Sequence, residues 1–136
     1  MGKLESLQTG ARKAGHLEQD ESVQQFALTK GGSRVVKGEE GTMKSLGRIA
    51  MAQGGRGALL ATDRSLHVVG LGQIGFKSVK EEHLNIPIGD AALSKKGNLL
   101  KVGTRDDPFL WYFTLPPYVS NIKQLTRYVE SRAEAP

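Results

Sequence analysis

Short apolar runs separated by turn residues dominate the second half of the chain. Two of them, Gly57–Thr62 and Ser65–Val69, flank Asp63-Arg64 and predict a β-hairpin. Further strands are predicted at 84–88, 99–102 and 109–115, because prolines, glycines and aspartates bound these segments. Turn-separated strands at such intervals favour an antiparallel barrel or sandwich.

The first half of the chain has a weaker pattern. Val23–Thr29 alternates apolar and polar residues and predicts a first strand. The glycine-rich segment 31–57 predicts a long loop with at most short strands around Arg34–Lys37 and Leu46–Ala52. Helical spacing appears near both ends. Residues 1–22 predict a short docked helix or a frayed tail, and a proline pair precedes an amphipathic C-terminal helix. The apolar stripe of that helix consists of Tyr118, Ile122, Leu125 and Val129.

Composition narrows the class of protein. The 136 residues suit one domain, and the absence of cysteine removes disulfides and thiolate metal sites. No apolar run approaches the roughly 20 residues that span a bilayer, and the N-terminus lacks a signal-peptide core, so we expect a cytoplasmic protein. The net charge of +5 indicates attraction to anionic partners, and the basic excess lies within residues 23–56.

The order of these elements resembles the bacterial pleckstrin-homology-like (PH-like) family. The resemblance rests on Ala58–Val69, an apolar strand, a Thr-Asp-Arg turn and a second apolar strand, and on Leu84–Asp90. It implies a mainly β fold: a bent antiparallel barrel of about seven strands capped by one C-terminal helix. The corresponding division is a short helical extension at 1–22, the PH-like domain at 23–133 and a tail at 134–136. Members of the family bind lipids, phosphorylated head groups or proteins, and the fold alone does not choose among them.

The basic segment Lys30-Gly-Gly-Ser-Arg34, with Lys37 beyond, is the first candidate site. Its spacing resembles the loop between the first two strands of lipid-binding PH domains, where lysine and arginine grip phosphates. Cationic side chains beside the free amides of a glycine loop can bind anions. The alternative is a solvated loop that keeps the protein soluble. Lys77, Lys80, Lys95 and Lys96 could extend this basic face, although Glu81 and Glu82 partly cancel it.

The segment Gly70-Leu-Gly-Gln-Ile-Gly75 is a literal G-x-G-x-x-G motif. In a dinucleotide-binding oxidoreductase, Gly70, Gly72 and Gly75 would approach a pyrophosphate, and Asp90 would hold the ribose. The context argues against this alternative, because 76–84 is too short for a crossover helix and Pro87 interrupts the next run. We therefore predict that these glycines form a turn or bulge between adjacent strands.

The sequence gives little support for a metal site, a catalytic site or a nucleic-acid-binding site. The three histidines, His16, His67 and His83, lie in separate segments without metal-ligand spacing, and Glu81-Glu82 has the pattern of solvated charge. No nucleic-acid-binding motif accompanies the basic charge, although a nucleic-acid-binding protein stays an alternative. We expect no enzyme, cofactor or metal. The predicted function is a binding or adaptor module acting through protein–protein contact or self-association at strand edges and the glycine-rich loop, with peripheral contact to anionic lipid as the variant.

Overall fold

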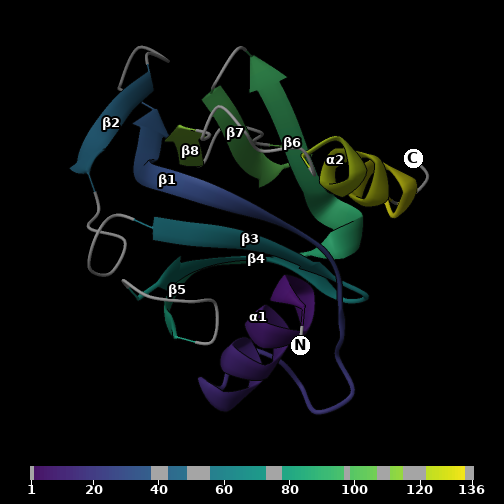
Figure 1. Cartoon of the computed structure of the whole chain (residues 1–136). Coiled ribbons are helices and arrows are strands. Elements are labelled where there is room, and N and C mark those ends of the chain that lie inside the picture. Colours follow the sequence, from purple (N-terminus) through teal and green to yellow (C-terminus); the bar gives the residue numbers. More distant parts are fainter. Residues whose placement is uncertain are drawn as a thin grey trace.

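The computed structural model describes residues 2–37, 43–48, 56–72, 78–96, 99–106, 111–114 and 122–133. Within these residues, two α-helices, eight strands and one 3₁₀ turn follow each other in sequence (Figure 1). In order they are α1 (Lys3–Lys13), β1 (Val23–Lys37), β2 (Met43–Arg48), β3 (Arg56–Thr62), β4 (Ser65–Leu71), β5 (Val79–Pro87), η2 (Ile88–Asp90), β6 (Ala91–Lys96), β7 (Leu99–Thr104), β8 (Trp111–Thr114) and α2 (Ile122–Ser131). The predicted mainly β fold with a C-terminal helix is confirmed.

Antiparallel pairing joins the strands in the order β5-β4-β3-β1-β8-β7-β6, and β2 pairs with β1 off this path. The long strand β1 belongs to both halves of the sheet. Its first part, Val23–Lys30, pairs with β3, and its second part pairs with β8 and β2. Figure 1 shows β1 running from the β3–β5 half to the β6–β8 half.

The sheet is open, so the expectation of a closed barrel is wrong. The order begins at β5 and ends at β6, and these two strands do not pair within the described residues. They meet at a corner, since the three residues Ile88–Asp90 lead from β5 directly into β6. Helix α2 packs against β6, β1 and β3, so it covers the apolar interior where the sheet does not close.

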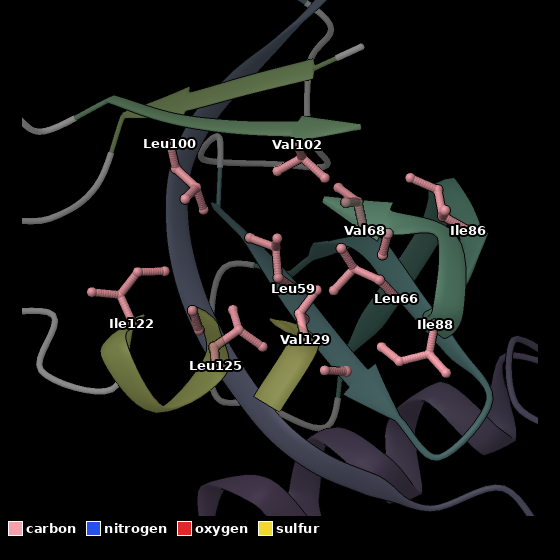
Figure 2. Packing of buried hydrophobic residues seen from close by; sticks show 13 residues of the cluster. Leu59, Leu66, Val68, Ile86, Ile88, Leu100, Val102, Ile122, Leu125 and Val129 are labelled. Carbon is pink, nitrogen blue, oxygen red and sulfur yellow. The ribbon is translucent and has the colours of Figure 1, made fainter. Parts of the chain in front are cut away.

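The main core lies between the two halves of the sheet and beneath α2. Figure 2 shows side chains from β3, β4 and β7 pointing toward those of α2. The stripe predicted on the C-terminal helix is confirmed for Ile122, Leu125 and Val129, all of which are buried. Tyr118 lies outside the described residues. Covering this interior is the reason that α2 holds its position, because one amphipathic face buries what the sheet leaves open.

A second core lies on the outer face of the β3–β4 hairpin, under α1. Side chains alternate along β3, so Leu59 enters the main core while Leu60 packs under the helix. Helix α1 contributes Leu7 and Ala11, both fully buried, to this second cluster. Residues 1–22 therefore include a docked helix, one of the two predicted forms. Burial on both faces also explains why this hairpin has continuous apolar runs.

Other predictions of the sequence are confirmed in part. The hairpin around Asp63-Arg64 and the strands at 84–88 and 99–102 are present. Strand β1 continues to Lys37, so the predicted loop begins later than expected. The aromatic strand is described as Trp111–Thr114, and Phe109 and Leu115 lie outside the described residues.

Candidate functional site

One edge of the sheet ends at β6. Its pairing with β7 is regular over all six residues, and the amide of Arg105 donates to the carbonyl of Asp90 at 2.9 Å just before the first pair. Since bonded and non-bonded pairs alternate in an antiparallel ladder, the amides and carbonyls of Ala91, Leu93 and Lys95 point away from β7. No described strand pairs with that side of β6. The edge therefore presents a row of backbone groups suited to an added strand.

The opposite edge, β5, is less suited to an added strand. Its pairing with β4 contains two register shifts, so the strand is irregular. It carries exposed Lys80 and Glu81 and ends at Pro87, and charges, bulges and prolines are features that discourage pairing with another chain. Strand β6 has no register shift and no proline.

A hollow of about 290 Å³ lies between β6 and α2. Lys95 lines it from the strand, and Ile122, Lys123, Thr126 and Arg127 line it from the helix. The Thr126 hydroxyl donates to the carbonyl of Ile122 at 2.8 Å, so this hydroxyl is engaged with its own helix. The hollow thus combines an apolar floor with the stems of three cationic side chains, whose charged ends can remain in water.

A buried polar network lies on the face of the sheet that α1 covers. The Nε2 atom of His67 is 2.8 Å from Oε2 of Glu21, and its Nδ1 atom is 2.8 Å from Oε2 of Glu82. Thr62 also donates its hydroxyl to Oε2 of Glu21, and the amide of Glu18 donates to Oε1 at 3.0 Å. His67 is 1% exposed and Glu21 is 3% exposed. An ionised carboxylate can only accept, so the ring nitrogen of His67 that faces ionised Glu21 is the donor of that hydrogen bond.

Burial and hydrogen bonding oppose each other at Glu21. Burial raises the pKa of this carboxyl, but hydrogen bonds from Thr62, His67 and the Glu18 amide outweigh it and hold the pKa below its ordinary value of 4.5. The carboxylate is therefore ionised at neutral pH. It ties the segment that follows α1 to the β3–β4 hairpin.

The same segment has further polar ties. Arg12 donates to the carbonyl of Glu21 at 2.7 Å, and the amide of Val23 donates to the side chain of Gln8 at 2.8 Å. An ion pair joins Asp20 to Arg64 in the hairpin turn. Together these contacts hold the N-terminal segment against the sheet.

The structure places Lys30, Arg34 and Lys37 within β1 and not in a loop. Their backbones pair with Thr114, Trp111 and Met43 respectively, so strand pairing already organises this segment. The loop expected between the first strand and Arg34 is wrong, because β1 continues through Gly31 and Gly32, and the short strand allowed around Arg34–Lys37 is the end of β1. Their role in anion binding stays a prediction.

The glycine motif connects two neighbouring strands. Strands β4 and β5 pair antiparallel, and the amide of Gly72 donates to the carbonyl of Ser78 at 2.8 Å. The predicted strand connection is therefore confirmed, whereas a dinucleotide motif needs a parallel strand after a crossover helix. Gly70 lies in β4 and Asp90 in η2, while Gly75 lies outside the described residues.

The sequence alone predicts neither the polar network nor the hollow. The pair Glu81-Glu82 predicts solvated charge, yet Glu82 contacts His67. The sequence predicts no role for Glu21, which also contacts His67. One signal was available: His67 interrupts the apolar run Leu66–Val69, and a polar residue in a strand that is buried on both faces needs a partner. Among the described residues, no group of three or more histidines or carboxylates could hold a metal ion.

Comparisons with family models, curated proteins and solved structures found no match for this chain. Among the helices that the structure describes, none is long and apolar enough to cross a membrane.

Proposed function

We propose that this chain is a PH-like, non-catalytic binding module that adds an extended segment of a protein partner to strand β6. The PH-like part of the proposal is supported by the strand order and by α2 at the opening of the sheet. Both agree with the bent sheet and closing helix that the sequence resemblance implies. The agreement concerns architecture, and the binding function needs an observation of its own.

The free edge of β6 is that observation. Ala91, Leu93 and Lys95 direct their amides and carbonyls away from β7, so a partner strand would meet them at the usual spacing along a sheet. Backbone hydrogen bonds supply affinity in this mode of recognition, while pockets beside the edge select side chains. A single added strand buries less surface area than the roughly 1,200 Å² of a standard protein–protein interface, so we expect weak, reversible binding.

A non-catalytic role is supported by the state of the histidine that would be the natural base. Both ring nitrogens of His67 contact carboxylates at 2.8 Å, and the side chain is buried. A general base must reach the proton that it removes from a substrate. We therefore assign His67 to stability.

The test uses peptides selected from a random display library on the immobilised protein. Lys95→Pro removes one outward amide without removing a bond to β7, and Lys95→Ala is the matched control for the lost cation. We expect selected peptides to bind the wild type and Lys95→Ala, to lose most of their affinity for Lys95→Pro, and to shift the amide resonances of Ala91, Leu93 and Lys95. Peptides that bind Lys95→Pro equally well would refute addition to β6. If sedimentation velocity shows that Lys95→Pro abolishes a dimer, the partner strand belongs to a second copy.

A further inference from the structure

The hollow beside β6 indicates the chemistry of the partner. We propose that the added segment places one apolar side chain in this hollow and flanks it with acidic side chains that pair with Lys95, Lys123 and Arg127. The inference rests on the proposed function, because the same strand edge positions the segment.

The size of the hollow favours a single side chain. Ligand sites for whole small molecules span roughly 300–1,000 Å³, and this hollow of about 290 Å³ lies at the lower limit. A peptide bound along β6 needs space for a side chain and not for a complete ligand. The edge of the strand would carry the remainder of the contact.

The lining favours an apolar group. Ile122 supplies the floor, and Thr126 directs its hydroxyl to the carbonyl of Ile122, which leaves its methyl group as the available surface. The other lining residues are long side chains with apolar stems. A polar group placed at the floor would find few hydrogen-bonding partners there.

The charges around the hollow favour acidic neighbours. Lys123 and Arg127 are four residues apart, so they lie on the same face of α2, and Lys95 faces them from β6. All three side chains are exposed. The sequences of β6 and α2 contain one acidic residue, Glu130. The positive charge around the hollow is therefore little compensated by the two elements that form it.

The alternation of side chains along a strand predicts the sequence pattern of the added segment. Alternate residues of an added strand face the same side, so an apolar residue in the hollow has its same-side neighbours two positions away. The expected motif is therefore an acidic residue, any residue, a leucine-like residue, any residue and an acidic residue. Each exposed ion pair changes affinity by about 1.5- to 5-fold, so the two acidic residues of the motif give a preference on the order of tenfold.

The test compares two dye-labelled peptides by fluorescence anisotropy. The first is Thr-Glu-Thr-Leu-Thr-Glu-Thr with blocked ends, and the second has glutamine in place of both glutamates. We expect the wild type to bind the acidic peptide on the order of tenfold more tightly at low salt, with the preference decreasing at high salt. The double variant Lys123→Glu/Arg127→Glu should lose the preference, whereas Lys13→Glu, an exposed reversal on α1, should keep it.

The outcomes separate this inference from the proposed function. Equal affinity for both peptides, with both lost in Lys95→Pro, overturns the acidic preference and supports addition to β6. A preference that survives in Lys123→Glu/Arg127→Glu also overturns the inference, and so does the absence of binding by either peptide at millimolar concentration. A preference that Lys95→Pro leaves intact supports the chemistry of the hollow and overturns strand addition. Binding to anionic vesicles that Lys123→Glu/Arg127→Glu abolishes, without binding to the acidic peptide, would overturn the inference and show that a membrane occupies this face.

Discussion

Replacing His67 with leucine would remove the partner of a buried carboxylate while keeping a side chain that can fill the space. Glu21 would retain the Thr62 hydroxyl and the Glu18 amide but would lose the imidazole at 2.8 Å. Glu82 is less affected, because its side chain is 23% exposed and can be hydrated. The cost of the substitution therefore falls on Glu21.

The loss of unfolding free energy depends on how deeply His67 and Glu21 are buried. Leaving a buried carboxylate without one of its hydrogen-bond donors costs about 1–3 kcal/mol of unfolding free energy, and more for a charged group. His67 and Glu21 are 1% and 3% exposed, so solvent screening reduces this little. A domain of ordinary stability has about 5–15 kcal/mol in total, so the variant should still fold but with a small margin. The double variant Glu21→Leu/His67→Leu removes the unpaired charge, and we expect it to be more stable than His67→Leu alone.

The pH dependence of the unfolding free energy tests independently whether the unpaired Glu21 carboxylate causes the loss of stability. The folded pKa of Glu21 lies below 4.5, so its contribution to wild-type stability is complete above that pH and is lost as the pH falls through the folded value. In His67→Leu the unpaired carboxylate favours its protonated form, which costs less to bury. The gap in stability between wild type and His67→Leu should therefore narrow as the pH falls below 4.5, where the wild type also loses the contribution of Glu21. His83 also destabilises the acidified protein, since burial lowers its pKa below 6.5, but it does so in both proteins and cancels in the difference.

Urea unfolding at several pH values would measure these quantities. The slope of free energy against urea should be equal in all variants, so that differences in midpoint report stability. A loss of less than about 1 kcal/mol in His67→Leu would contradict the reasoning, because it would mean that Glu21 does not depend on this partner. A gap that stays constant with pH, or a double variant no better than the single one, would contradict it as well.

Three further predictions concern the rest of the chain. Leu125→Ala should lower the unfolding free energy by about 2–5 kcal/mol, since Leu125 is fully buried in the main core, and urea unfolding measures this loss. Leu7→Ala should selectively accelerate hydrogen exchange in α1, because its side chain docks that helix on the sheet; unchanged exchange would mean that the helix holds by other contacts. If Lys30, Arg34 and Lys37 bind anionic lipid, the protein should sediment with anionic vesicles at low salt and detach at high salt, and glutamate at all three positions should abolish this; absence of binding at every salt concentration contradicts that prediction.

The sequence predicts well where neighbouring residues determine the structure. Asp63-Arg64 lies between two apolar runs, and local turn chemistry alone indicates that hairpin. The stripe at Ile122, Leu125 and Val129 similarly predicts α2. The openness of the sheet was not predictable in this way, since it depends on how far β5 and β6 diverge after the corner at Ile88–Asp90.

The candidate sites depend on residues that are distant in sequence. His67 meets Glu21 because α1 and its connection fold back over the hairpin, and no periodicity relates the two positions. The hollow likewise forms between Lys95 of β6 and Lys123 of α2, which the chain brings together only in the tertiary structure. Taken alone in the sequence, each of these residues has the pattern of an exposed polar side chain, and only its tertiary contact shows that it belongs to a site.

The shared strand β1 has a consequence for the order of folding. Strands β3, β4 and β5 follow each other along the chain and pair as neighbours, so this meander needs short loop closures and should form early. The pairing of β1 with β8, where Lys30 meets Thr114, joins nearly opposite ends of the chain and carries a much larger closure entropy. Both halves of the sheet meet at β1, so we expect this long-range closure to limit the folding rate and to make the two halves unfold together.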